Sequence, residues 1–149
     1  RGVYPVALAH LLLGEPEFVH VTGSLGKTGV DADAGLLMTW PGGVRAFAET
    51  SLIGTLPTNA GITGTDGRID IAAPFHAARS LTVRKHPDAE EVRIDDAPKQ
   101  ALAAELREVR DRVRQGATES PVMPLDATLA VMRILDDART ALGATPCPA

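Results

Sequence analysis

Apolar residues near the start of the chain recur at helical spacing, at Leu8, Leu11 and Leu12. Pro5 suits the first turn of a helix, where its missing N–H is no loss, and Gly14 suits the position just past the end. The pattern therefore predicts a helix that ends before Gly14 and buries its leucines against the rest of the fold.

Apolar and polar positions alternate in the next segment, EFVHVTGSL, and this period of two predicts a strand. The two faces of that strand differ in chemistry. One face carries Phe18, His20, Thr22 and Ser24, and the other carries Val19, Val21 and Leu25.

Further short runs predict hairpins. AGLLMTW and VRAFAETSL flank the turn PGG at 41–43, where glycine supplies unusual backbone angles. NAGITGTDGRIDI repeats this arrangement around Asp66–Gly67, and RSLTVRK and EEVRID flank a break at Pro87–Asp88. Because connections this short join antiparallel neighbours, about six or seven strands between residues 17 and 95 predict one antiparallel sheet.

Helical spacing returns after Pro98 and predicts two further helices with apolar stripes. The first stripe comprises Leu102, Leu106, Val109 and Val113, and the second comprises Leu125, Leu129, Met132, Leu135, Ala138 and Leu142 before Gly143. Charges of both signs in ELREVRDRVRQ favour a solvated helix face over a binding surface. The order of helix, sheet and two helices predicts the α+β class.

Composition and charge narrow the classes of function. The 149 residues suit a single domain with its own core, and the net charge of −4 argues against a nucleic-acid partner. Cys147 has no second cysteine to pair with, so we expect neither a disulfide nor a cysteine metal cluster, and a reducing cytoplasm fits. No apolar run reaches the ~20 residues that span a bilayer, so no membrane partner is expected.

Patterns that suggest phosphate or metal sites fail on spacing. TGSLGKTG ends like a phosphate-binding loop, but Val21 stands where that motif needs its first glycine. The dinucleotide pattern G-x-G-x-x-G is also absent, so the segment is better interpreted as a glycine-rich loop between strands with Lys27 in solvent. No two histidines stand at i, i+4 in a helix or i, i+2 in a strand, so no metal site is expected.

Tyr4 and the loop APFHAAR are the remaining candidates for chemistry. Tyr4 stands in the first helical turn, from which a phenol can reach past the helix end, and a phenol of lowered pKa can donate and accept a proton. In the loop, Phe75 and His76 are candidates to line a pocket. By composition alone a packed or surface tyrosine and a loop histidine without a role are the defaults, so a further observation has to assign either one.

Four stretches of the chain together carry a resemblance. GVYPVALAHLLLGEP is similar to a family helix with the motif D-x-G-x-Y, and VDADAGLLMTWPGGVRAFAETS to a hairpin that begins V-D and turns at P-G-G. AGITGTDGRIDIAAPF matches a turn of the form I-x-G-T-x-G-x-I, and ESPVMPLDATLAVMRILDDARTALG resembles a terminal helix introduced by E-S-x-x-M-P. From residue 1 to about 143 the chain resembles the C-terminal domain of the Gfo/Idh/MocA oxidoreductases, in the branch like dihydrodiol and sugar dehydrogenases.

This resemblance implies a predominantly antiparallel open sheet with helices on one face. Residues 1–149 would form a single substrate-binding and oligomerisation domain, which in the family follows a Rossmann domain that binds NAD or NADP. The Rossmann fingerprint and the lysine of the family's E-K-P motif are not in this chain, and the aspartate of D-x-G-x-Y would precede Arg1. The chain is therefore interpreted as a fragment that binds no cofactor and is inactive by itself.

The resemblance also implies roles for particular residues. Tyr4 falls on the family's acid/base position for hydride transfer between a nicotinamide and a hydroxyl-bearing carbon, and Phe75 and His76 would contact substrate. The implied partners are a small sugar, polyol or diol and a second copy of the chain, bound through a sheet face. An apolar face suited to such a dimer is expected from Leu36, Met38 and Trp40, with Val44, Ala46 and Ala48 nearby.

Two other functions stay open from the sequence. The chain could be a stand-alone interaction module whose sheet serves only self-association or partner binding, which requires a natural start codon close to Arg1. Alternatively, a longer parent could bind the cofactor without catalysis, and Tyr4 argues against that reading. An upstream reading frame that encodes G-x-G-x-x-G and E-K-P would exclude the stand-alone module.

Overall fold

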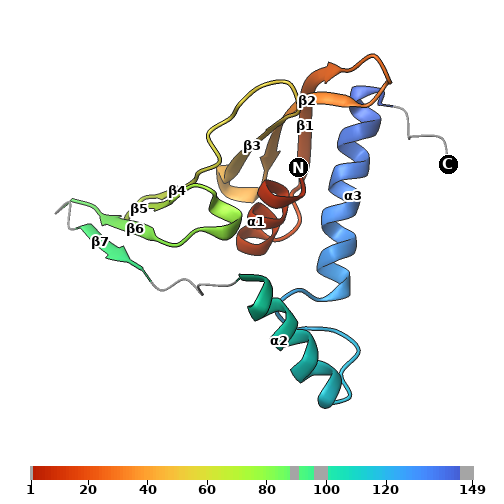
Figure 1. The fold of residues 1–149 in the computed structure, drawn as a ribbon. Coiled ribbons are helices and arrows are strands. Elements are labelled where there is room, and N and C mark those ends of the chain that lie inside the picture. The colour runs from red at the N-terminus through yellow and green to blue at the C-terminus, as the bar shows by residue number, and fades with distance from the viewer. Residues whose placement is uncertain (1, 88–90, 96–100, 145–149) are drawn as a thin grey trace. The chain divides into compact units, whose positions relative to one another are not determined.

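The computed structural model describes residues 2–87, 91–95 and 101–144. It divides into two compact units: unit 1 is Arg1–Leu56 with Pro121–Ala149, and unit 2 is Pro57–Ser120 (Figure 1). Unit 1 contains α1 (Val3–Leu13), β1 (Phe18–Leu25), β2 (Asp31–Thr39), a 3-10 turn η1 (Pro41–Gly43), β3 (Arg45–Ser51) and α3 (Leu125–Leu142). Unit 2 contains β4 (Ala60–Gly64), β5 (Gly67–Ile71), a 3-10 turn η2 (Phe75–Ala77), β6 (Leu81–Lys85), β7 (Glu91–Ile94) and α2 (Ala101–Arg114).

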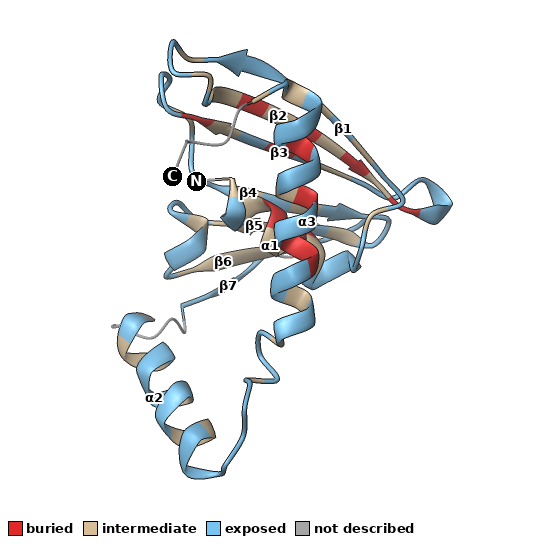
Figure 2. Ribbon diagram, turned by 90° about the vertical axis from the view of Figure 1, so that its right-hand side faces the viewer, coloured by how far each residue is buried: buried red, intermediate tan, exposed pale blue. Residues whose placement is uncertain are grey.

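Unit 1 is an antiparallel three-stranded sheet with helices on one face. The strands run in the order β1-β2-β3, and register places Val21 opposite Leu36 and Leu36 opposite Ala48. Helices α1 and α3 contact each other and pack on this face (Figure 2). The buried core between the two layers consists of Val6, Ala9, Ala34, Leu36, Met38, Trp40, Ala48, Val131, Ile134 and Ala138.

Local turn chemistry in unit 1 follows the sequence patterns. Gly14 closes α1 with a φ of 76°, and its N–H donates to the carbonyl of His10 at 2.8 Å. Gly42 and Gly43 turn the hairpin between β2 and β3 with φ values of 76° and 80°, which side chains other than glycine rarely adopt. The predicted first helix and the predicted hairpin at 41–43 are therefore confirmed.

The buried face of α1 differs from the sequence prediction. Leu11 and Leu12 are 70% and 50% exposed, whereas Val6 and Ala9 are buried. This helix is apolar around most of its circumference, so helical spacing could not select the face that packs. The smaller side chains of Val6 and Ala9 face the core, Leu8 is half-buried, and Leu11 and Leu12 were wrongly predicted to fill the core.

A similar correction applies to α3. The core face of α3 carries Ala130, Val131, Ile134 and Ala138. Of the stripe predicted from sequence, Ala138, Leu135 and Leu142 pack on the core. The other three residues of that stripe, Leu125, Leu129 and Met132, are exposed. Two apolar stripes run along this helix, and packing on α1 and β1 selected the one rich in small residues. Gly143 ends the helix in the left-handed conformation, as predicted.

Unit 2 is a four-stranded antiparallel sheet in the order β4-β5-β6-β7, followed by α2. One face of the sheet carries a chain of ion pairs: Arg68 contacts Asp70 at 2.7 Å, Asp70 also contacts Arg84, and Arg84 contacts Glu91 at 3.1 Å. The other face carries Ile62, Ile69, Ile71, Leu81, Val83, Val92 and Ile94. None of the described residues of unit 2 is a buried apolar residue.

The described residues confirm the α+β class and seven strands with antiparallel pairing throughout, but the strands form two sheets where one was predicted. The break follows β3. The Ser51 hydroxyl accepts hydrogen bonds from the N–H groups of Ile53 at 3.1 Å and Gly54 at 2.7 Å, which turns the chain out of the strand. Short connections predicted antiparallel neighbours elsewhere, but the longer segment from 52 to 59 carries no such constraint.

Candidate functional site

Tyr4 stands in the first turn of α1, two residues after the capping position occupied by Gly2. Its side chain is 50% exposed, while the next turn of the helix enters the core through Val6. Pro5 is accepted in this first turn because the N–H groups there have no partner within the helix. The phenol is thus held at the surface by a helix that is anchored in the core of unit 1.

Phe75 and His76 lie together in unit 2, in the short 3-10 turn η2. Their rings meet edge to face, with centroids 5.7 Å apart and planes inclined at 87°. The N–H of Phe75 donates to the carbonyl of Thr58 at 2.7 Å, which fixes the start of the turn. The structure therefore groups these two candidates with each other, and Tyr4 belongs to the other compact unit.

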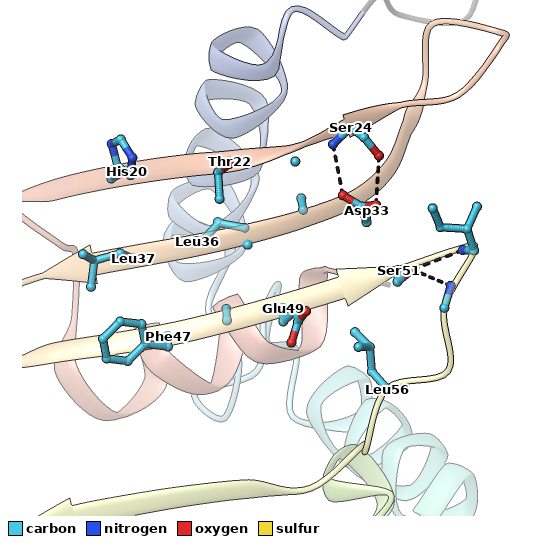
Figure 3. A pocket seen from close by; sticks show the side chains of 16 residues that line it. His20, Thr22, Ser24, Asp33, Leu36, Leu37, Phe47, Glu49, Ser51 and Leu56 are labelled. Atoms are coloured by element: carbon cyan, nitrogen blue, oxygen red, sulfur yellow. Dashed lines mark hydrogen bonds between the residues drawn. The ribbon is translucent and has the colours of Figure 1, made fainter.

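The open face of the β1–β2–β3 sheet carries a hollow that sequence analysis did not single out (Figure 3). Register aligns His20, Leu37 and Phe47 across the three strands, and places Gly35 between Thr22 and Glu49 in the next row. Because Gly35 has no side chain, nothing from that position fills the hollow. The alternation in EFVHVTGSL was the signal that this face differs from the core face.

One end of this hollow is fixed by hydrogen bonds. The carboxylate of Asp33 accepts from the N–H of Ser24 at 3.0 Å and from its hydroxyl at 2.8 Å (Figure 3). Nearby, Gly23 lies so close to β2 that an added Cβ would overlap the carbonyl oxygen of Asp33. The glycine therefore permits the close approach of β1 and β2 that this double hydrogen bond requires.

The apolar sheet face predicted for a dimer is already covered within the chain. Leu36, Met38 and Trp40 are buried under α1 and α3, and the indole N–H of Trp40 donates to the carbonyl of Gly14 at 3.2 Å. The prediction that these residues form a free dimer surface is wrong, since helices from both ends of the chain bury them. The face open to a partner carries Phe18 and Phe47, which are 67% and 75% exposed.

The glycine-rich segment after Gly23 is a turn between β1 and β2, as predicted. The N–H of Gly26 donates to the carbonyl of Val30 at 2.8 Å, which closes a hairpin. A dinucleotide phosphate is usually bound where a glycine-rich loop opens a helix, and this segment joins two antiparallel strands. This turn does not fit the phosphates of a nicotinamide cofactor.

The described residues contain neither a metal-binding cluster nor a helix that could span a membrane. Across 2–87, 91–95 and 101–144, no three His, Cys, Asp or Glu side chains are grouped as they would be around a metal ion. Within the same ranges, no helix combines the length and the apolar character needed to cross a membrane. Cys147 lies outside the described residues.

Comparison with known proteins decides the family. A family model described as the GFO/IDH/MocA C-terminal domain matches residues 1–70, which include Tyr4 and all three strands of unit 1. The chain contains a GFO/IDH/MocA C-terminal domain. The matched segment holds the predicted D-x-G-x-Y-like helix and the P-G-G hairpin, so these two motifs carried the resemblance correctly.

Relatives of this GFO/IDH/MocA domain extend the match to nearly the whole chain. Trans-1,2-dihydrobenzene-1,2-diol dehydrogenase from Mus musculus is 32% identical over 151 residues, which cover 97% of the chain and 45% of the relative. The enzyme of the same name from Homo sapiens is 29% identical over 153 residues, covering 97% and 45%. The chain thus spans about half the length of the relatives that it matches.

Solved structures support the fold. UDP-N-acetylglucosamine 3-dehydrogenase GnnA from Acidithiobacillus ferrooxidans superposes with a TM-score of 0.78 at 21% identity, covering 96% of the chain and 46% of that protein. A 3-ketoreductase from Actinomadura kijaniata, solved with NADP, gives a TM-score of 0.73 at 20% identity, covering 94% and 45%. At these identities the likeness shows the GFO/IDH/MocA fold alone.

Proposed function

We propose that the chain is the C-terminal domain of an NAD(P)-dependent oxidoreductase that acts on a hydroxyl or carbonyl of a sugar, polyol or dihydrodiol. The observation that carries this proposal is the family match over residues 1–70. It is supported by the similarity of the chain, over 97% of its length, to a dihydrodiol dehydrogenase. The cofactor is held outside residues 1–149, because the glycine-rich turn here joins strands. The chain by itself is therefore inactive.

Tyr4 is the proton-exchanging residue of this proposed enzyme. Its phenol accepts the proton of the substrate hydroxyl during oxidation and returns one to the carbonyl oxygen during reduction. The position at the exposed first turn of a core-anchored helix supports this role, since the phenol is presented to solvent on a fixed backbone. Phe75 and His76, whose rings meet edge to face in unit 2, are the candidate residues for substrate contact.

The domain also forms a subunit interface through its open sheet face. That face carries exposed Phe18 and Phe47 around a central Leu37, and its polar border includes His20 and Glu49. An apolar centre with a polar rim is the usual composition of a protein interface. The homodimer is therefore assigned to the face opposite the helices, in place of the buried face predicted from sequence.

Three measurements test the enzyme proposal. The upstream reading frame should encode G-x-G-x-x-G and E-K-P, and a stop or a natural start close to Arg1 would favour the stand-alone interaction module instead.

In the longer enzyme, Tyr4→Phe should lower kcat by about 10²–10⁴-fold with little change in folding. Titration of residues 1–149 with NADH should show no saturable binding, and tight binding would contradict the proposal.

The interface is tested separately, by sedimentation equilibrium of residues 1–149. Phe47→Glu places a charge on the open face beside the central Leu37 and should abolish any dimer formed there. Thr63→Glu in unit 2 adds the same charge outside that face and serves as the control. Equal self-association of the two variants would exclude the sheet face as the interface.

A further inference from the structure

Helix α2 exposes a complete apolar stripe. Leu102, Leu106, Val109 and Val113 are 68%, 63%, 59% and 68% exposed, and they follow one another at intervals of four, three and four residues. The sequence predicted this stripe as one face of an amphipathic helix, with charged residues on the other side. Four large apolar side chains on one helix face are costly to leave in water and mark a surface that a partner covers.

The opposite side of α2 is held by its own chain. The carboxylate of Glu108 accepts from the guanidinium of Arg112 at 2.9 Å and from the hydroxyl of Ser120 at 2.7 Å. After Gly116, which has a φ of 71°, the N–H of Ala117 donates to the carbonyl of Arg112 at 3.0 Å. These contacts fix the chain that leaves the helix against the polar side, and the apolar stripe stays free of them.

The spacing of the stripe makes it complementary to itself. Intervals of four, three and four are those of a coiled-coil seam, in which each helix presents one apolar row to the other. When two copies of α2 pack antiparallel, Leu102 lies opposite Val113 of the second copy, and Leu106 lies opposite Val109 of the second copy. By symmetry all four side chains of each copy find an apolar partner, and none is left over.

The charges beside the stripe agree with the antiparallel direction. Glu105 and Arg112 flank the same edge of the seam, one near each end. In an antiparallel pair, Glu105 of each copy lies near Arg112 of the other, so the symmetric assembly gains two contacts between opposite charges. Within its own helix, Arg112 pairs with Glu108 at 2.9 Å on the polar side.

We propose that α2 is a self-association helix, through which two copies of this chain pair antiparallel along Leu102, Leu106, Val109 and Val113. This contact uses residues other than those of the sheet-face interface, so one chain can take part in both contacts. The helix is about 21 Å long. Four side chains supply only part of the about 800 Å² that a stable interface buries per partner, so the α2 contact is weak and concentration-dependent.

Cross-linking tests the direction of pairing. In a Cys147→Ser background, one sample of residues 1–149 carries Leu102→Cys and a second, distinguishable by mass, carries Val113→Cys, since identical positions then lie eleven residues apart along an antiparallel pair. After mixing, a short bis-maleimide should join the two different variants at least about tenfold more often than two copies of either one. Preferred linkage of identical variants would indicate parallel pairing, and no linkage would show that copies do not meet here; either result overturns the proposal.

Sedimentation equilibrium tests the energetics. Val109→Asp in a Phe47→Glu background should raise the dissociation constant of the remaining association at least about tenfold. Arg107→Asp, which adds the same side chain on the charged side of α2, is the matched control and should leave that constant within about twofold. Equal constants for the two variants would overturn the α2 pairing and would leave the enzyme proposal, which rests on Tyr4, unaffected.

The longer enzyme supplies a further outcome. If the thiols of Leu102→Cys and Val113→Cys are protected from alkylation there and still do not cross-link, another part of that protein covers the stripe. That result overturns pairing with a second copy. If dilution of the longer enzyme makes the thiols open to alkylation and also abolishes the cross-link, the result supports pairing of two copies.

Discussion

Units 1 and 2 have similar secondary structure but differ in how they bury it. Among the described residues, all eleven buried apolar side chains belong to unit 1, where α1 and α3 cover one face of a sheet. Unit 2 has a sheet with one apolar face and a helix with an apolar stripe, and neither surface reaches full burial. A stable domain needs two packed layers, so unit 2 depends on contacts outside itself more than unit 1 does.

The difference also reflects where the layers come from along the chain. Unit 1 joins α1 at one end of the sequence to α3 at the other, so its core is closed by long-range contacts. Unit 2 is one continuous segment of neighbouring hairpins and a helix. The ion pairs on one face of its sheet are exposed and contribute little to stability.

The largest expected effect is a truncation in the core of unit 1. Met38 is 1% exposed between the sheet and the helices, so Met38→Ala should lower the free energy of unfolding by about 2–5 kcal/mol. Val92→Ala in unit 2, where the side chain is 43% exposed, should cost less than about 1 kcal/mol. In urea denaturation, the fluorescence of Trp40 measures the loss in unit 1 and circular dichroism measures the loss in unit 2. Equal losses would remove the contrast between the units.

The next effect is a difference in local opening. Backbone amides in β2 should exchange with solvent at least about tenfold more slowly than those in β6, because fewer buried contacts oppose the opening of unit 2. Hydrogen exchange followed by mass spectrometry resolves peptides from each strand. Equal protection in residues 1–149 at low concentration would mean that unit 2 is stable without a partner.

A smaller effect concerns the polar side of α2. Ser120→Ala removes the hydroxyl that donates to Glu108 at 2.7 Å, which should cost about 0.5–1.5 kcal/mol. The loss should appear as faster exchange of the amides in the last turn of α2, with no change in β2. Ser120→Thr keeps a hydroxyl and should restore protection, and faster exchange in both variants would assign the effect to backbone strain instead.

The smallest effect is electrostatic. A hydrogen bond from Arg110 lowers the pKa of Asp111 in the folded chain. The carboxylate therefore stabilises the fold at any pH above the pKa that Asp111 has in the unfolded chain. This contribution is lost as the pH falls through the lower pKa that Asp111 has in the folded chain. Both groups are exposed, so the difference between the parent chain and Asp111→Asn should be barely measurable near pH 7 and absent in acid. A difference that grew as the pH fell would contradict this sign.

Part of the site could be predicted from the sequence because its signals are local. The helix that begins beside Tyr4 and the turn at Gly42–Gly43 follow from proline, glycine and apolar spacing within a few residues. Family motifs in residues 1–70 then identified the domain. The edge-to-face contact of Phe75 with His76 is also local, since the two residues are adjacent in one turn.

By itself, the sequence determined the element types, their order and most of their ends, since hydrogen-bonding period and turn chemistry act over a few residues. Only the tertiary structure decided which faces are buried. Leu11 and Leu12 are apolar yet exposed, and Leu36 and Met38 lie under helices from both ends of the chain instead of at a free dimer surface. The reason is that burial depends on what packs opposite, and those partners come from distant parts of the sequence.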